Sequence, residues 1–166
     1  MKTKDLIVGI VILAILGVVI YFWQTNKREL QVPEPTTNPL VQEEIEERFN
    51  VVLPEDAEKI QLNDAKGEDA TAIATRSFTD ENFTLTILAS LPVPKEGSYY
   101  QGWIVRGEEG ESDYAVLTLG RLSVAKGGYV LEFEASKDYS NYDKVVVSEE
   151  LVPDKEIEEI VLEGSF

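Results

Sequence analysis

The sequence has 166 residues and a formal net charge of −16, and it contains neither cysteine nor histidine. This length suits one domain with an additional segment and is too short for two ordinary domains. The missing residue types exclude disulfides, thiolate nucleophiles, Cys-based zinc sites and the commonest general base at neutral pH. The acidic charge argues against nucleic acid as a partner, because it repels phosphate backbones.

An uncharged run from Leu6 to Trp23 predicts a single transmembrane helix behind a short tail of residues 1–5. A helix of this length spans about 27 Å, and its final aromatic residues suit a membrane interface. A cleavable signal peptide is disfavoured, because the run is long and no small-residue cleavage site follows it. Basic residues flank the run equally, so the charge pattern leaves its orientation open.

Residues 24–38 predict an extended stalk, since they are polar, contain two prolines and lack hydrophobic periodicity. A short helix and a connection are predicted for residues 39–58. Asn38 is the expected N-cap, and Pro39 occupies the first helical position. The apolar side chains recur at helical spacing, which predicts that this helix packs on the following domain.

Period-two patterns dominate residues 59–166 and predict short strands separated by turns. A turn at Lys126–Gly128 predicts a hairpin between residues 116–124 and residues 129–135. Strands at spacings of about ten residues indicate an all-β domain, specifically a β-sandwich. The predicted strands comprise residues 59–63, 70–77, 83–91, 99–106, 116–124, 129–135, 144–149 and 159–163.

The sequence contains no pattern that predicts catalysis or cofactor binding. Glycine-rich phosphate loops are missing, and catalytic triads built on histidine or cysteine are excluded. We therefore expect a chain that is not an enzyme, with no cofactor, no metal and no small-molecule substrate. Asp138, Asn141 and Asp143 offer calcium-type oxygens, but Asp and Asn in such a segment are first interpreted as turn residues.

Tyr99, Tyr100 and Trp103 form the densest aromatic cluster of the predicted domain. Tryptophans in strands of a β-sandwich often pack in its core, so we expect Trp103 to be buried there. The alternative is an exposed aromatic strip that binds carbohydrate or a protein partner.

Three segments follow one another in a recognisable order and spacing. They are Leu91–Gly97 with the nearby Tyr100, Gln101 and Trp103, then Val145–Glu150, then Ile160–Gly164. Together they resemble the extracytoplasmic C-terminal domain of anti-sigma-K factors, whose LPxxxxGxxYQxW segment precedes two closing strands. The resemblance singles out five motif residues as candidate partner contacts, namely Tyr100, Gln101, Trp103, Glu150 and Gly164.

This resemblance implies a bacterial single-pass plasma membrane protein with its N-terminus in the cytoplasm and its β domain outside. Family members also carry a cytoplasmic sigma-binding domain, which we expect to be missing because only Met1–Asp5 precede the predicted helix. We expect an extracytoplasmic sensor or interaction module that binds a protein partner and regulates a sigma factor through it. The alternative is a structural or adhesive domain of the cell envelope without a signalling role.

Overall fold

The structure is a computed structural model that describes residues 37–67 and 70–166. These described residues group into one compact unit. The predicted tail, the predicted transmembrane helix Leu6–Trp23 and the predicted stalk up to residue 36 lie outside the described residues. In the part that is described, no helix is both long and apolar enough to cross a membrane.

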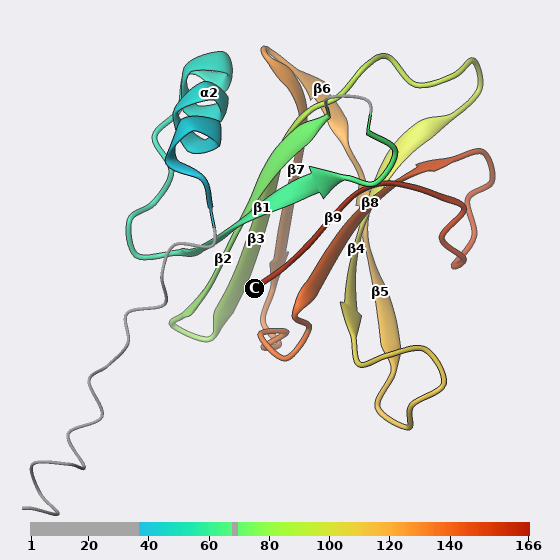
Figure 1. The fold of residues 1–166 in the computed structure, drawn as a ribbon. Helices are drawn as coiled ribbons and strands as arrows, with labels where there is room; N and C mark the ends of the chain where they lie inside the picture. Colours follow the sequence, from blue (N-terminus) through green and yellow to red (C-terminus); the bar gives the residue numbers. More distant parts are fainter. Residues whose placement is uncertain (1–36, 68–69) are drawn as a thin grey trace, which may run out of the picture. The chain divides into compact units, whose positions relative to one another are not determined.

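A single antiparallel sheet forms most of this unit (Figure 1). Its nine strands occur in the order β5-β4-β8-β9-β1-β2-β3-β7-β6. Their bounds are β1 Glu58–Asp64, β2 Thr71–Thr79, β3 Asn82–Ser90, β4 Tyr99–Arg106, β5 Ala115–Arg121, β6 Ser123–Ala125, β7 Gly128–Ala135, β8 Lys144–Glu150 and β9 Glu159–Ser165.

The sheet rolls up until its two edges nearly meet. β5 and β6 are the opposite edges of the sheet, yet only Leu122 separates them along the chain. The Leu122 N–H donates to the Tyr100 carbonyl oxygen at 2.9 Å, which ties this crossing to the start of β4. A single interior therefore collects side chains from both halves of the sheet, including Ile60, Ile87 and Val147.

The all-β class is confirmed, but one rolled sheet replaces the two separate sheets of the predicted sandwich. Strand alternation shows only that one face of each strand is buried, and both arrangements satisfy that requirement. The predicted hairpin is correct only for β6, because β5 pairs with β4 and not with β7. Gly120, at φ +110°, lies where the chain leaves β5 for the opposite edge.

The helix α2, Pro39–Phe49, forms as predicted. The Asn38 side chain accepts the Leu40 N–H at 3.1 Å, and Pro39 occupies the first turn, where its missing N–H removes no helical bond. Ile45 and Phe49 pack against Ile73 and Leu88 on the outer face of β2 and β3 (Figure 1). The predicted packing of this helix on the domain is therefore confirmed.

A second part of the outer face is covered by the segment between β8 and β9. Here Trp103, Val105 and Val146 form a small apolar cluster against Val116, Ile157 and Ile160. Both faces of β4 and β8 are consequently buried, so that these two strands bury polar residues such as Gln101 and Ser148 as well as apolar ones.

Candidate functional site

Several connections meet at one end of the rolled sheet, which we call the upper end after its place in Figure 1. It comprises residues 64–67, 91–98 and 149–159, together with β6. Strand pairing brings these segments to the same end. Tyr99 at the start of β4 lies opposite Glu150 at the end of β8, and Ala89 near the end of β3 lies opposite Tyr129 near the start of β7. The upper end contains a hollow of about 210 Å³, lined by Asp64, Lys66, Ala70, Leu91, Pro92, Val93, Lys95, Tyr100, Glu149, Glu159 and Val161.

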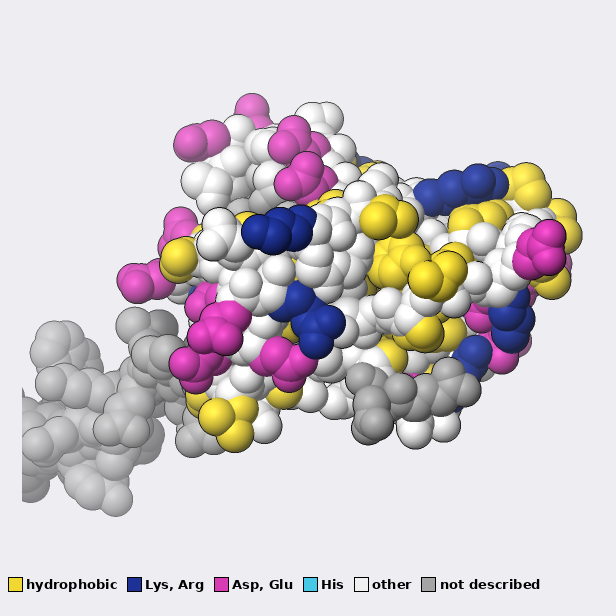
Figure 2. Space-filling model, turned by 90° about the horizontal axis from the view of Figure 1, so that it is seen from above, with side chains coloured by type: hydrophobic (Ala, Val, Ile, Leu, Met, Phe, Trp, Pro, Cys, Tyr) yellow, Lys and Arg dark blue, Asp and Glu magenta, His cyan; other side chains and the backbone are white. Residues whose placement is uncertain are grey.

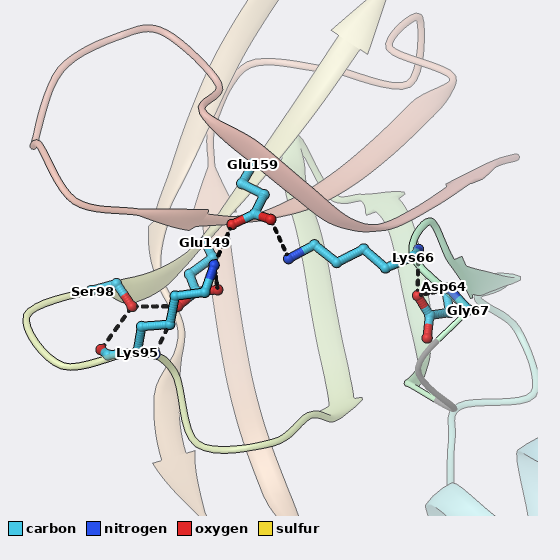
Figure 3. A network of polar contacts seen from close by, with 7 residues as sticks. All are labelled: Asp64, Lys66, Gly67, Lys95, Ser98, Glu149 and Glu159. Carbon is cyan, nitrogen blue, oxygen red and sulfur yellow. Dashed lines mark hydrogen bonds and ion pairs between the residues drawn. The ribbon is translucent and has the colours of Figure 1, made fainter.

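A chain of ion pairs crosses this hollow (Figure 3). Lys66 Nζ lies 2.7 Å from one carboxylate oxygen of Glu159, and Lys95 Nζ lies 2.7 Å from the other. Hydrogen bonds from Lys66 and then from Lys95 lower the pKa of Glu159 to about 2. Glu159 is therefore ionised at neutral pH and holds the two lysines on either side of it.

Glu149 extends this chain towards the connection before β4. Its Oε1 accepts the Ser98 hydroxyl and, at 2.7 Å, the Lys95 N–H, while its Oε2 lies 3.5 Å from Lys95 Nζ. Burial opposes ionisation of this carboxyl, but the hydrogen bonds from Ser98 and Lys95 outweigh it, and the pKa of Glu149 is lowered. The pKa of Lys95 is raised, chiefly by its hydrogen bond to Glu159.

Asp64 positions the turn that presents Lys66. One of its carboxylate oxygens accepts the N–H groups of Lys66 and Gly67 at 2.6 and 2.8 Å, and the other accepts the Ala70 N–H at 3.0 Å. Three backbone donors on one carboxylate fix the turn, as the Asx turns of many proteins do. The charged groups of the hollow are thus held by local structure as well as by one another.

Large apolar side chains are exposed around the same end of the sheet. Figure 2 views the domain from above and shows hydrophobic side chains gathered near the middle and at the right margin, with Lys and Arg beside them. Clustered exposed apolar residues are typical of interaction sites, because single domains otherwise keep such patches small. The upper end contributes Val93, Val124, Leu151 and Val152, of which Val93 is 87% exposed.

The motif residues from the sequence lie mainly inside the fold. Tyr100 points into the interior, packs edge-on against Tyr129 at 5.1 Å and borders the hollow. Gln101 is buried, and Gly164 lies in β9, where an added Cβ would come within 2.5 Å of the Gln61 carbonyl oxygen. Gly164 therefore permits the close approach of β9 to β1.

Trp103 and Glu150 meet through Ser148 in a buried network on the outer face. Trp103 Nε1 donates to Ser148 Oγ at 2.7 Å, and the Ser148 hydroxyl donates to Glu150 Oε1. That oxygen also accepts the Glu158 N–H at 3.2 Å, while Glu150 Oε2 has no hydrogen-bond partner among the described residues. Trp103 is 1% exposed, so the predicted burial is found, although it lies under the β8–β9 segment and not in the main interior.

The sequence analysis did not single out Lys66, Lys95, Glu149 or Glu159. Charged residues are frequent in this chain, and nothing in their spacing distinguishes these four from the others. Asp138 accepts the Ser140 N–H at 2.8 Å, as expected of a turn residue. Across residues 37–67 and 70–166, no group of three or more acidic side chains is arranged to hold a metal ion.

No family model, no curated protein and no solved structure matches this chain.

Proposed function

We propose that this chain is a membrane-anchored interaction module whose β domain lies outside the cytoplasm and binds a protein partner at its upper end. One observation carries the proposal, namely that a hollow with fixed charges, bordered by the exposed Val93, lies at the same end of the sheet as further exposed apolar residues. The predicted helix Leu6–Trp23 supports the anchor, and the resemblance to anti-sigma-K factor ectodomains supports the orientation. The same resemblance supports a role in regulating a sigma factor through that partner.

The chemistry of the hollow favours binding over catalysis. A general acid or base works best with a pKa near the working pH. Here the pKa values of Glu149 and Glu159 are lowered and the pKa of Lys95 is raised, so all three move away from neutral pH. These groups therefore stay charged at neutral pH. Fixed opposite charges of this kind suit the recognition of polar groups on a partner.

The size of the hollow favours a protein over a small molecule. Sites for drug-sized ligands usually enclose about 300–1,000 Å³. A hollow of about 210 Å³ instead has room for one large side chain of a partner protein. In this arrangement the partner inserts one residue beside the chain of ion pairs from Lys66 through Glu159 to Lys95, and its surrounding surface covers Val93 and Val152.

Capture of the full-length protein from cross-linked intact membranes tests this proposal when wild type is compared with two matched variants. Val93 and Val52 are 87% and 86% exposed, but Val52 lies between α2 and β1, outside the upper end. We expect Val93→Glu to reduce recovery of the partner about tenfold, because it places a charge in an apolar contact. Val52→Glu should leave recovery unchanged.

Two outcomes would contradict the proposal. Equal recovery of the same protein with both variants would place its binding site elsewhere on the domain. Recovery of general envelope components alone would favour a structural or adhesive surface domain.

A further inference from the structure

β5 leaves one of its edges without a strand partner. Its ladder partner is β4, and its other edge has none within the described residues. Beyond Val130, one edge of β7 also lacks a strand partner in the described residues, because β6 pairs with only the first three residues of β7. β5 and β7 contact one another, but no ladder joins them. The rolled sheet is therefore open between these two strand edges.

Over Ala115–Thr118 the β5 edge lacks the features that usually prevent strand addition, since the charged Arg121 and an irregularity at Leu119 lie in the last part of the strand. Proteins commonly protect such edges with charged residues, proline or a covering segment. Residues 115–120 read AVLTLG and carry no charge and no proline, although 28% of the chain is charged. A register shift opposite Gly102 and Trp103 leaves Leu119 as an extra residue, so the regular part of this edge comprises Ala115–Thr118.

The surroundings of this edge are acidic. Six exposed carboxylates lie in the segment before β5 or on β7, and none forms an ion pair within the described part of the chain. Arg106, opposite Ala115 in the ladder, donates its Nε–H to the Asp113 carbonyl oxygen at 2.9 Å and forms no ion pair with these carboxylates in the described residues. These residues are Glu108, Glu109, Glu111, Asp113, Glu132 and Glu134.

We propose that the β5 edge binds an extended, basic segment of another protein, which adds to the sheet as an antiparallel strand. Main-chain hydrogen bonds to Ala115–Thr118 would give affinity, as in other cases of strand addition. Lysine or arginine side chains of the segment would pair with the surrounding carboxylates and give specificity. A second copy of this chain is a poor occupant, because it would place the same uncompensated carboxylates opposite one another. The proposal does not rest on partner binding at the upper end.

The test uses the full-length chain in detergent solution and three synthetic ten-residue peptides. The first alternates lysine with valine or threonine, the second replaces each lysine with glutamate, and the third is the lysine peptide with alternate backbone nitrogens methylated. We expect only the unmodified lysine peptide to bind and to slow amide hydrogen exchange at residues 115–118. Methylation removes backbone donors without changing charge, so it separates strand addition from simple ionic attraction.

Two charge-reversal variants sharpen the test. Glu109→Lys combined with Glu132→Lys should weaken binding of the lysine peptide about tenfold. Glu43→Lys combined with Glu47→Lys, on the exposed face of α2, makes the same change in net charge and should have a much smaller effect. Val93→Glu should leave peptide binding unchanged, so failure at this edge and failure at the upper end are distinguishable.

Several results would overturn the proposal. They are equal binding of the methylated peptide, protection from exchange only outside β5, and no binding at millimolar peptide. A concentration-dependent dimer with protected β5 amides would assign this edge to self-association instead.

Discussion

Two polar networks of this domain use similar chemical groups and differ mainly in their exposure to water. The buried network joins Trp103, Ser148 and Glu150, and Glu150 is only 1% exposed. The upper-end network joins Lys66 and Lys95 to Glu159, whose side chain is 48% exposed, and Lys95 also pairs with Glu149. Buried donors and acceptors that lose a partner cost far more than exposed ones, because water cannot replace the partner. The first network therefore stabilises the fold, while most of the second remains available to a ligand.

The largest effect should follow removal of the Trp103 side chain. Trp103→Ala should lower the free energy of unfolding by about 3–5 kcal/mol, because it empties a buried position under the β8–β9 segment. Urea denaturation measures this change, with Trp103→Phe as a control that keeps an aromatic ring. A loss below about 1 kcal/mol would contradict the structural role of this residue.

Removal of the Glu150 carboxylate should have the next largest effect. Glu150→Ala leaves the Ser148 hydroxyl and the Glu158 N–H without their acceptor, which should cost about 1–3 kcal/mol. Glu150→Gln keeps an acceptor oxygen and should cost less than the alanine variant in the same denaturation measurement. The reverse order would show that the charge of Glu150, and not its hydrogen bonds, stabilises the β8–β9 segment.

A smaller, pH-dependent effect is expected at Glu159. Its pKa is about 2 in the folded protein against a usual value of 4.5, so the ionised form is favoured by folding. Its contribution to stability is complete above about pH 4.5 and is lost as the pH falls towards 2. Glu159→Gln should therefore be less stable than wild type at neutral pH, and the difference should shrink as the pH falls towards 2 and vanish below it. A difference that persists unchanged in acid would rule out the ion pairs as its cause.

The smallest effect is expected for Lys66→Met, which removes one of the two lysines that hold Glu159. Exposed and half-exposed pairs contribute about 0–1 kcal/mol, and salt weakens them further. Thermal denaturation at low and at high salt should show a small difference from wild type that shrinks as salt is added. A difference of several kcal/mol would place the upper-end network in the same class as the buried one.

Local structure was largely predictable from the sequence. The N-cap at Asn38 and the following Pro39 predicted α2, and alternation placed most strands to within two residues. The rolled arrangement was not predictable, because it depends on the crossing at Leu122 from one sheet edge to the other. Alternation describes each strand alone and does not specify which strand lies beside it.

The candidate site was only partly predictable for a similar reason. Tyr100 and Trp103 stand three positions apart on one strand, so alternation places them on opposite faces, as the structure shows. The upper-end network joins Lys66 and Lys95, from two connections, to Glu159 at the start of β9, and the three residues are far apart in the sequence. Only the order of strands in the sheet brings these residues together, and that order was not available from the sequence pattern.

Site-specific photo-cross-linking tests partner binding at the upper end most directly. A photoreactive amino acid is placed at Val93 or at Val52 of the full-length protein in intact cells, since the two positions are almost equally exposed. Binding at the upper end predicts one discrete adduct from position 93 and none from position 52. No adduct from position 93, or the same adduct from both positions, would contradict it.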